Sequence, residues 1–356
     1  MNDLSTPASS CVDCRQPSWA DFRTRWFWGG ASLLLGTTVL SLALGRYAVP
    51  LAELLQFLGA WLGLGDFPHE RYALLHSLVV EVRLPRVLAA ILVGAGLSVS
   101  GAAYQAVFRN PLVSPGLLGV LSGCAFGAAL GMVLGLGGAW IPLLGGVTGL
   151  LAVAVGVGIA GLFRNSSILI LVLGGIVSNA LFNALLSIVK YLADPLDQLP
   201  SIVYWMLGSL SAVDSAVLAW TGPLLALAIL AMCLLGRAID ALSLSDEEAL
   251  SLGVPVRRLR YGIIALATLI SALTVSIAGM VGWVGLLIPH LARLLVGPAN
   301  ARLVPMSACL GGLFLLVADD LARTLTRGEI PLGILTELLG AIAFVLVLNR
   351  VRRGWL

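Results

Sequence analysis

The chain has 356 residues, of which 59% are hydrophobic and 11% are charged, and its mean hydropathy is +1.01. A soluble domain of this length cannot bury so much apolar surface, so the composition indicates a polytopic, all-α membrane protein. The net charge is only +3 and the arginines are scattered, which excludes nucleic-acid binding because that function requires a concentrated basic surface.

The first 25 residues form a polar tail that precedes the first apolar segment. It contains Asp3, Asp13 and Asp21, whereas a cleavable signal peptide begins with basic residues followed by an apolar stretch. Cys11 and Cys14 have the spacing of a redox or metal site, but no second ligand pair lies nearby. We interpret residues 1–25 as a cytoplasmic tail and residues 26–356 as one transmembrane domain.

About ten apolar segments have the roughly 20-residue length that a helix needs to cross about 30 Å of hydrocarbon. The predicted spans are residues 26–46, 82–108, 117–136, 140–163, 168–192, 212–235, 261–279, 280–297, 304–324 and 331–349. The mixed stretch 47–81 between the first two spans predicts a surface helix. If the N-terminus is cytoplasmic, most of the 21 basic residues lie in the cytoplasm, as the positive-inside rule requires. Both termini are then cytoplasmic.

Small residues recur at every fourth position through the third predicted span. Such a stripe lets a second helix backbone approach closely, and this packing replaces the missing hydrophobic drive inside lipid. Gly94, Ser98 and Ala102 repeat the pattern in the preceding span. A smooth wall along a substrate path is the alternative interpretation. The predicted packing residues are Gly119, Gly123, Gly127, Gly131 and Gly135.

A charged segment at 242–258 interrupts the apolar runs of the second half and has the pattern of a short amphipathic helix. Ser243 or Ser245 can cap it, and acidic residues follow in the first turn, where the helix dipole favours negative charge. Gly253 and Pro255 end it. The segment is either a solvated connector or a docking element for a cytoplasmic partner. Its apolar side consists of Leu244, Ala249, Leu250 and Leu252.

The chain lacks the residue patterns of ATP hydrolysis and of metal chemistry. Its single lysine, Lys190, does not follow the glycine pattern of a phosphate-binding loop. The three histidines show no metal-ligand spacing, and there is no nucleophile–base arrangement. We therefore expect no catalytic residue, no metal site and no cofactor in this chain. It is interpreted as a passive pathway whose energy comes from another subunit.

Several long motifs, in order from about residue 30 to the C-terminus, resemble the FecCD-type permeases. These are the membrane subunits of type II ABC importers for vitamin B12, haem and ferric siderophores. The motifs are VRLPRVLAA at 82–90, QAVFRNPLVSPGLLG at 105–119, YWMLGS at 204–209, GMVGWVGLLIPH at 279–290, ADDLAR at 318–323 and EIPLG at 329–333.

The resemblance implies a permease of ten spans per subunit that works as a homodimer. It also implies two partner ATPase subunits, which carry the ATP and Mg²⁺, and a periplasmic or lipid-anchored binding protein that delivers the substrate. The coupling loop to the ATPase would be about residues 237–260. Its implied coupling residues are Ser245, Asp246, Glu247, Ala249, Leu250, Leu252 and Gly253.

Two further sets of residues take implied roles from the resemblance. Arg83, Arg86 and Arg323 would receive carboxylates of the binding protein, with headgroup anchoring as the alternative role. Asn110 and Leu112 would form a cytoplasmic gate, although Asn110 can equally form a turn before Pro111. The second gate of relatives is a Ser/Thr-rich loop. The corresponding gate residues implied here are Ser166 and Ser167, which depart from that pattern because Ile168 and Leu169 follow them directly.

Acidic residues inside predicted spans are expensive in hydrocarbon and need partners. Asp319 and Arg323 are four residues apart on one helix and can face one another, whereas the pattern suggests no partner for Asp320. We predict a multi-pass permease of the inner membrane that imports a ferric siderophore or haem. Cobalamin is the alternative substrate. An ion-coupled secondary transporter and a non-transport membrane scaffold are the rival classes.

Overall fold

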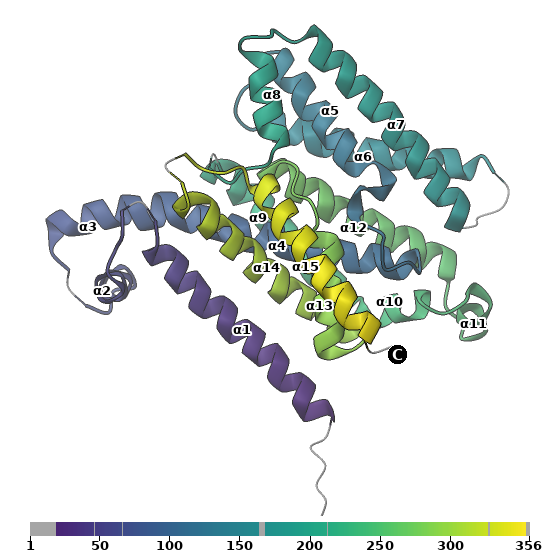
Figure 1. Ribbon diagram of the computed structural model, residues 1–356, viewed down its shortest axis with the longest axis horizontal. Coiled ribbons are helices and arrows are strands. Elements are labelled where there is room, and N and C mark those ends of the chain that lie inside the picture. Colours follow the sequence, from purple (N-terminus) through teal and green to yellow (C-terminus); the bar gives the residue numbers. More distant parts are fainter. Residues whose placement is uncertain are drawn as a thin grey trace, which may run out of the picture.

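The computed structural model describes residues 19–45, 47–65, 67–163, 168–211, 213–326 and 328–353, and all regular elements among them are helical. Figure 1 shows the arrangement. The elements are α1 (Trp19–Ala43), α2 (Leu51–Trp61), α3 (His69–Leu75), η1 (His76–Arg83), α4 (Leu84–Val107), η2 (Pro115–Leu118), α5 (Val120–Val133), α6 (Trp140–Gly161), α7 (Ile168–Leu192), α8 (Gln198–Met206), α9 (Ser215–Leu234), α10 (Gly236–Leu242), α11 (Asp246–Ser251), α12 (Val256–Ala278), α13 (Val284–Val296), α14 (Asn300–Thr324) and α15 (Leu332–Arg353).

Each of the ten predicted spans coincides with a helix, which confirms the polytopic, all-α architecture. Within the described residues, 6 helical segments are long and apolar enough to cross a membrane by themselves. The other four predicted spans correspond to shorter apolar helices: α1, whose described apolar part begins at Phe27, α5, α13 and α15. The boundary near Gly279 is confirmed, because α12 ends at Ala278. Hydropathy did not identify α8 and α10, which are short.

The second predicted span is wrong at its beginning, because helix continues from His69 to Val107 without interruption. Pro85 has no amide hydrogen and cannot donate to the regular i to i−4 hydrogen bonds of an α-helix. The turns before it form a π-helix, in which the Leu84 amide donates to the Val79 carbonyl. Arg83 and Arg86 therefore lie inside a long helical rod and not at the exposed start of a span.

Helix α4 lies at the centre of the molecule and packs against α9, α12, α13 and α14. Its glycines allow the neighbours to approach closely. A Cβ at Gly94 would lie 2.2 Å from the carbonyl oxygen of Gly311 on α14, and one at Gly101 would lie 1.9 Å from that of Gly285 on α13. Every residue from Val93 to Val107 is buried, so α4 is held by tight backbone packing along most of its length.

Helices α5, α6, α7 and α8 gather in one part of the molecule (Figure 1). The middle of the glycine stripe predicted for α5 packs closely against α6. A Cβ at Gly123 would meet the Thr148 carbonyl oxygen of α6 at 2.6 Å, and one at Gly127 would meet the Thr148 hydroxyl at 1.9 Å.

The outer members of the stripe have other surroundings. Gly119 packs closely against α7, where a Cβ would lie 3.1 Å from the Asn179 amide nitrogen, whereas the packing prediction is wrong for Gly131 and Gly135. A Cβ at Gly131 would make only ordinary contacts, and one at Gly135 would have no atom within 4 Å. Gly119 and Gly135 both adopt positive φ, at +84° and +70°, and lie just outside the two ends of α5. They serve the turns there, because glycine adopts this conformation without steric cost.

We expect Gly127→Leu to reduce the yield of folded, monodisperse protein, because a leucine would force α5 away from α6. The measurement is size-exclusion chromatography with thermal unfolding in detergent. Gly158→Leu is the matched control, since a Cβ there would meet no atom within 4 Å. Normal assembly with impaired transport would instead favour the pathway-wall interpretation of the stripe.

Candidate functional site

The predicted short helix of the 242–258 segment exists as α11, and local sequence signals account for both of its ends. The hydroxyl of Ser245 accepts from the Glu248 amide at 3.2 Å, while the Glu248 carboxylate accepts from the Ser245 amide at 2.9 Å. This is a reciprocal capping box. At the other end, Gly253 adopts φ +77°, and the Gly253 and Val254 amides donate to the Leu250 and Ala249 carbonyls in a Schellman motif.

The apolar side of α11 is divided between the protein interior and the surface. Ala249 is buried, whereas Leu250 and Leu252 are 60% and 69% exposed. Glu247 is also exposed. Two neighbouring exposed leucines on a short, well-capped helix provide a compact apolar projection, and nothing in the described residues covers it.

Asp246 connects α11 to two membrane helices. Its Oδ1 atom lies 2.7 Å from Nη2 of Arg260 on α12, and it also forms an ion pair with Arg109, which follows α4. The Arg260 and Arg109 guanidinium groups hold the pKa of Asp246 below its ordinary value. Asp246 therefore remains ionised at neutral pH and holds α11 against the end of α4.

Asn110 forms a tight turn after α4, as the turn interpretation of this residue predicts. Its Oδ1 atom accepts the Leu112 amide at 2.9 Å, and its carbonyl accepts the Val113 amide. Leu112 is 62% exposed. Arg109 immediately before the turn adopts φ +48° and donates to the Leu242 carbonyl at 3.0 Å. Ser166 and Ser167, the other predicted gate residues, lie outside the described residues.

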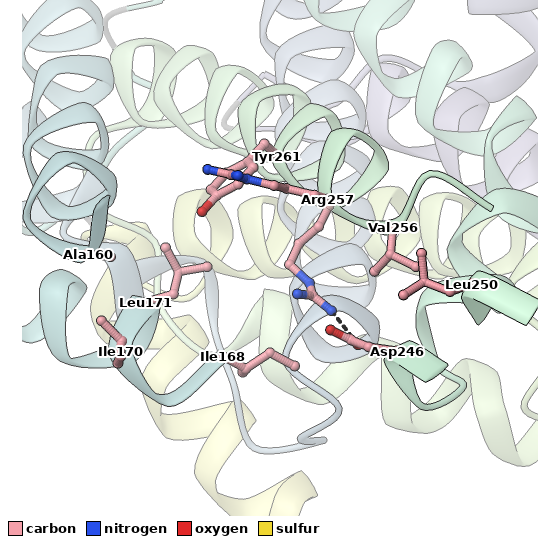
Figure 2. Close-up of a pocket in the computed structure, with 10 residues that line it drawn as sticks. Ala160, Ile168, Ile170, Leu171, Asp246, Leu250, Val256, Arg257 and Tyr261 are labelled. Atoms are coloured by element: carbon pink, nitrogen blue, oxygen red, sulfur yellow. Dashed lines mark hydrogen bonds and ion pairs between the residues drawn. The ribbon is translucent and has the colours of Figure 1, made fainter. Parts of the chain in front are cut away.

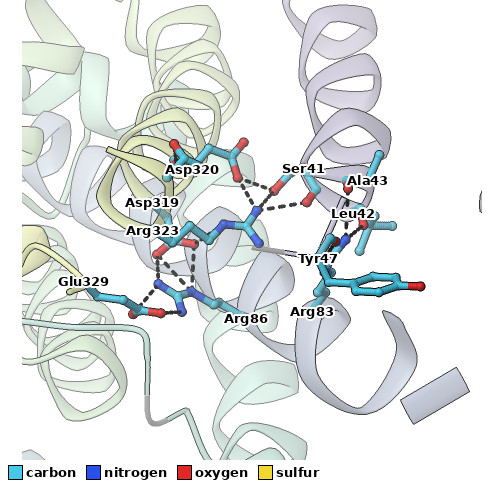
Figure 3. A network of polar contacts seen from close by, with 11 residues as sticks. Ser41, Leu42, Ala43, Tyr47, Arg83, Arg86, Asp319, Asp320, Arg323 and Glu329 are labelled. Carbon is cyan, nitrogen blue, oxygen red and sulfur yellow. Dashed lines mark hydrogen bonds and ion pairs between the residues drawn. The ribbon is translucent and has the colours of Figure 1, made fainter. Parts of the chain in front are cut away.

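Arg86 is held by two carboxylates from the other end of the chain (Figure 3). Its Nε lies 2.9 Å from Oδ2 of Asp319 on α14, and its Nη2 lies 2.9 Å from Oδ1, which is a bidentate pair. Its Nη1 donates to Glu329, in the loop before α15, at 3.1 Å. Asp319 is only 1% exposed, whereas the side chain of Glu329 is 27% exposed.

Arg323 pairs mainly with Asp320 and not with Asp319, which corrects the predicted pairing. The Asp319–Arg323 ion pair is present but long, at 3.8 Å. Arg323 instead forms an ion pair with Asp320 and donates to the carbonyl and hydroxyl of Ser41 at 2.9 and 2.7 Å. Ser41 also donates to Asp320 at 2.7 Å. Asp320 therefore has a clear role, which is to attach α14 to α1.

Arg83 is buried, and its guanidinium donates hydrogen bonds to backbone carbonyls. Its Nη1 donates to Leu42 and Ala43 at 2.6 and 3.0 Å, and Nη2 donates to Tyr47. Arg83 and Arg323 are 4% and 7% exposed. Two of the three arginines predicted to dock a partner are thus internal structural groups in this conformation, and the third is shared by two carboxylates.

The loop that carries Glu329 is joined to neighbouring loops by backbone hydrogen bonds. The Leu332 and Gly333 amides donate to the Gly208 and Leu207 carbonyls at 2.8 and 2.9 Å. The Ser209 amide in turn donates to the Ala278 carbonyl at 2.9 Å. The carboxylate on Arg86 is therefore connected to the segments that follow α8 and α12.

A cavity of about 550 Å³ adjoins these segments. Its lining includes the aromatic side chains of Tyr204 and Trp205 and the hydroxyls of Ser209 and Ser276. None of its described lining residues is charged. The cavity can accommodate a large group that has both apolar and hydrogen-bonding surface.

Comparisons of this chain with known proteins agree on one family. The model of the FecCD transport family matches residues 33–350. The molybdate import system permease protein of Haemophilus influenzae is 38% identical over 330 residues, which cover 90% of this chain and 94% of the relative. A permease of Helicobacter pylori named for iron chelatin transport is 40% identical over 287 residues, covering 80% and 86%.

A solved structure extends this likeness to three dimensions. It is an inward-facing conformation assigned to the metal-chelate type of ABC transporter, with a TM-score of 0.81 and 35% sequence identity. The match covers 92% of this chain and 99% of that chain. Other matching relatives carry the names of hemin and vitamin B12 permeases, so the relatives differ in substrate while sharing one fold.

Proposed function

This chain belongs to the FecCD transport family as the permease of an ABC importer, and we propose that it imports an iron chelate, either a ferric siderophore or haem. The observation that carries the proposal is the cavity between α8 and the ends of α6 and α12. Its volume of about 550 Å³ lies in the range of sites for drug-sized molecules, roughly 300 to 1,000 Å³.

The lining of that cavity favours a bulky complex over a small oxyanion. An oxyanion site generally supplies guanidinium, ammonium or several backbone amide donors, and the described lining contains no charged side chain. Serine hydroxyls and aromatic faces suit the oxygen-rich and apolar surfaces of an iron chelate. Cobalamin, which is also large and largely uncharged, is the second candidate.

We expect proteoliposomes that contain the permease, its ATPase and its binding protein to accumulate an iron chelate when ATP is supplied. The measurement is uptake of radioactive iron offered as a siderophore or as haem, with excess cobalamin or molybdate as competitor. Liposomes that contain the permease alone are the control and should neither hydrolyse ATP nor accumulate iron. Uptake of molybdate or cobalamin without uptake of either iron chelate would contradict the substrate proposal.

The coupling element of this importer is proposed to be α11, inserted into a cleft of the partner ATPase. In this proposal the homodimeric permease binds two ATPase subunits, and ATP and Mg²⁺ are bound by those subunits. Leu250 and Leu252 supply the apolar contact, and the capping box keeps α11 rigid. The ion pair between Asp246 and Arg109 supports the role, because it attaches α11 to the Asn110 turn, which is the candidate gate.

We expect Leu250→Asp combined with Leu252→Asp to abolish stable association with the ATPase. Each new carboxylate would lose its hydration in an apolar cleft without a partner, at a cost of several kcal/mol. The measurement is co-purification of the two subunits and ATPase activity of the reconstituted complex. Ser251→Asp is the control, since Ser251 is exposed on the same helix and already polar. Unchanged co-purification of the double variant would refute the docking role.

The docking site for the binding protein is proposed to centre on Arg86, with Arg83 and Arg323 holding the surrounding structure. Arg86 offers a planar fork that suits a partner carboxylate. Its partner Asp319 is buried, but Glu329 is partly exposed and is therefore the group that a partner carboxylate can replace. This arrangement makes Glu329 an internal competitor of the binding protein.

We expect Glu329→Gln to strengthen capture of the binding protein several-fold, because the amide competes less well for Arg86. Arg86→Lys should weaken capture, because lysine keeps the charge and loses the bidentate geometry. The measurement is the Kd of the binding protein for the permease–ATPase complex in nanodiscs, and Glu337→Gln, on the exposed surface of α15, is the control. If both changes at the Arg86–Glu329 pair leave the Kd unchanged, the pair is structural only.

A further inference from the structure

A second, smaller cavity lies between α11 and the neighbouring ends of three spanning helices (Figure 2). Its volume is about 180 Å³. One wall is apolar and comes from the start of α7, where Ile168, Ile170 and Leu171 lie. The opposite side carries Arg257 and Tyr261 of α12, and Arg260 also lines the cavity. An apolar wall that faces guanidinium groups is suited to an amphipathic anion.

The polar groups of this cavity have unused hydrogen-bonding capacity. Arg260 is 6% exposed and its Nη2 is bound to Asp246, but its buried Nε has no hydrogen-bond partner. A buried donor without a partner is costly, so a ligand or water that accepts from it is expected. Arg257 is exposed, and neither its guanidinium nor the Tyr261 hydroxyl makes a hydrogen bond or ion pair within the described chain.

The charge balance of the cavity is positive. Its one acidic lining residue is Asp246, which is already engaged by Arg260 and by Arg109. The lining itself carries two positive groups, Arg257 and Arg260, and one negative group, Asp246. The cavity therefore attracts an anion although a carboxylate lies in its wall.

The position of the cavity corresponds to the boundary between hydrocarbon and water. Among its lining residues, Ala160 is the penultimate residue of α6, Ile168 is the first residue of α7, and Val256 is the first residue of α12. All three helices span the membrane by length and composition. Lipid headgroups lie at this depth, and arginine and tyrosine are characteristic of it.

The size of the cavity limits the ligand to a small anionic group. Its 180 Å³ is several times the roughly 30 Å³ that one water molecule occupies in liquid, yet it is below the roughly 300 Å³ of a drug-sized site. A phosphate group fits, whereas a nucleotide or an iron chelate does not. Leu162 and Phe163, which follow the lining residue Ala160 directly after the end of α6, are 82% and 59% exposed and offer apolar surface for acyl chains.

We propose that this cavity binds the phosphate of an anionic phospholipid, with Arg257, the Nε of Arg260 and the Tyr261 hydroxyl as donors. The apolar wall formed by Ile168, Ile170 and Leu171 contacts the glycerol and the first methylenes. The site is independent of the transported substrate. Because Asp246 links it to α11, an occupied site stabilises the position of the proposed coupling helix.

The test uses the assembled permease–ATPase complex in nanodiscs of phosphatidylcholine that contain phosphatidylglycerol as the probe. Native mass spectrometry counts the phosphatidylglycerol molecules that stay bound after release from the nanodisc. Arg257→Gln is expected to reduce their retention about tenfold, as the loss of a charge-assisted hydrogen bond predicts. Tyr261→Phe should reduce retention to a smaller extent.

Arg258→Gln is the matched control, because Arg258 is an exposed neighbour that does not line the cavity. General attraction to an anionic surface would make the two arginine variants lose lipid equally, and that result would overturn the proposal. Two other occupants are distinguished by further arms. Displacement of the lipid by excess inorganic phosphate would show that the site takes free anions. Retention by the isolated permease but not by the ATPase complex would assign the cavity to a carboxylate of the ATPase. Either result would overturn the lipid assignment.

Discussion

The buried ion pair between Arg86 and Asp319 is the interaction on which the arrangement of the helices depends most directly. A single charge inside an apolar protein or lipid is very costly, and a paired charge is tolerated only when its geometry and remaining hydrogen bonds are satisfied. Asp319 is almost completely buried and has Arg86 as its bidentate partner. The pair therefore determines how α4 and α14 align, and the close contact of Gly94 with Gly311 is compatible with that alignment.

Helix α4 has an ionic connection at each of its ends. Near its beginning, Arg86 joins Asp319 and Glu329, and directly after its end Arg109 joins Asp246 of α11. Its middle is packed too tightly against α13 and α14 to bend freely. One rigid helix thus connects the proposed docking site for the binding protein with the proposed coupling helix, which is a physical basis for transmitting a signal across the membrane.

The arginine network around Arg86 and the charged residues around α11 differ in how many hydrogen-bond donors they leave without a partner. In the network of Arg83, Arg86 and Arg323, each guanidinium pairs with carboxylates or carbonyls of this same chain, and only the buried Nε of Arg323 lacks a hydrogen-bond partner among the described residues (Figure 3). Around α11, the Nε of Arg260 likewise has no partner, and in addition the whole guanidinium of Arg257 makes no hydrogen bond or ion pair with the described residues. Family resemblance pointed to the first group as a binding surface, whereas the structure shows more unused binding capacity in the second.

The sequence by itself determined the features that depend on local periodicity and local hydrogen bonding. Hydropathy located ten helices of the described chain as predicted spans, and Ser245, Glu248 and Gly253 specified α11 because capping groups act within a few residues. Only the tertiary structure decided which charges pair, because Arg86 and Asp319 are 233 residues apart and spacing on one helix favoured Arg323 instead. It also decided which glycines pack: Gly123 and Gly127 face α6, while Gly135 of the same stripe has no close neighbour. The reason in both cases is that the contact is made by a second helix, whose position no local pattern records.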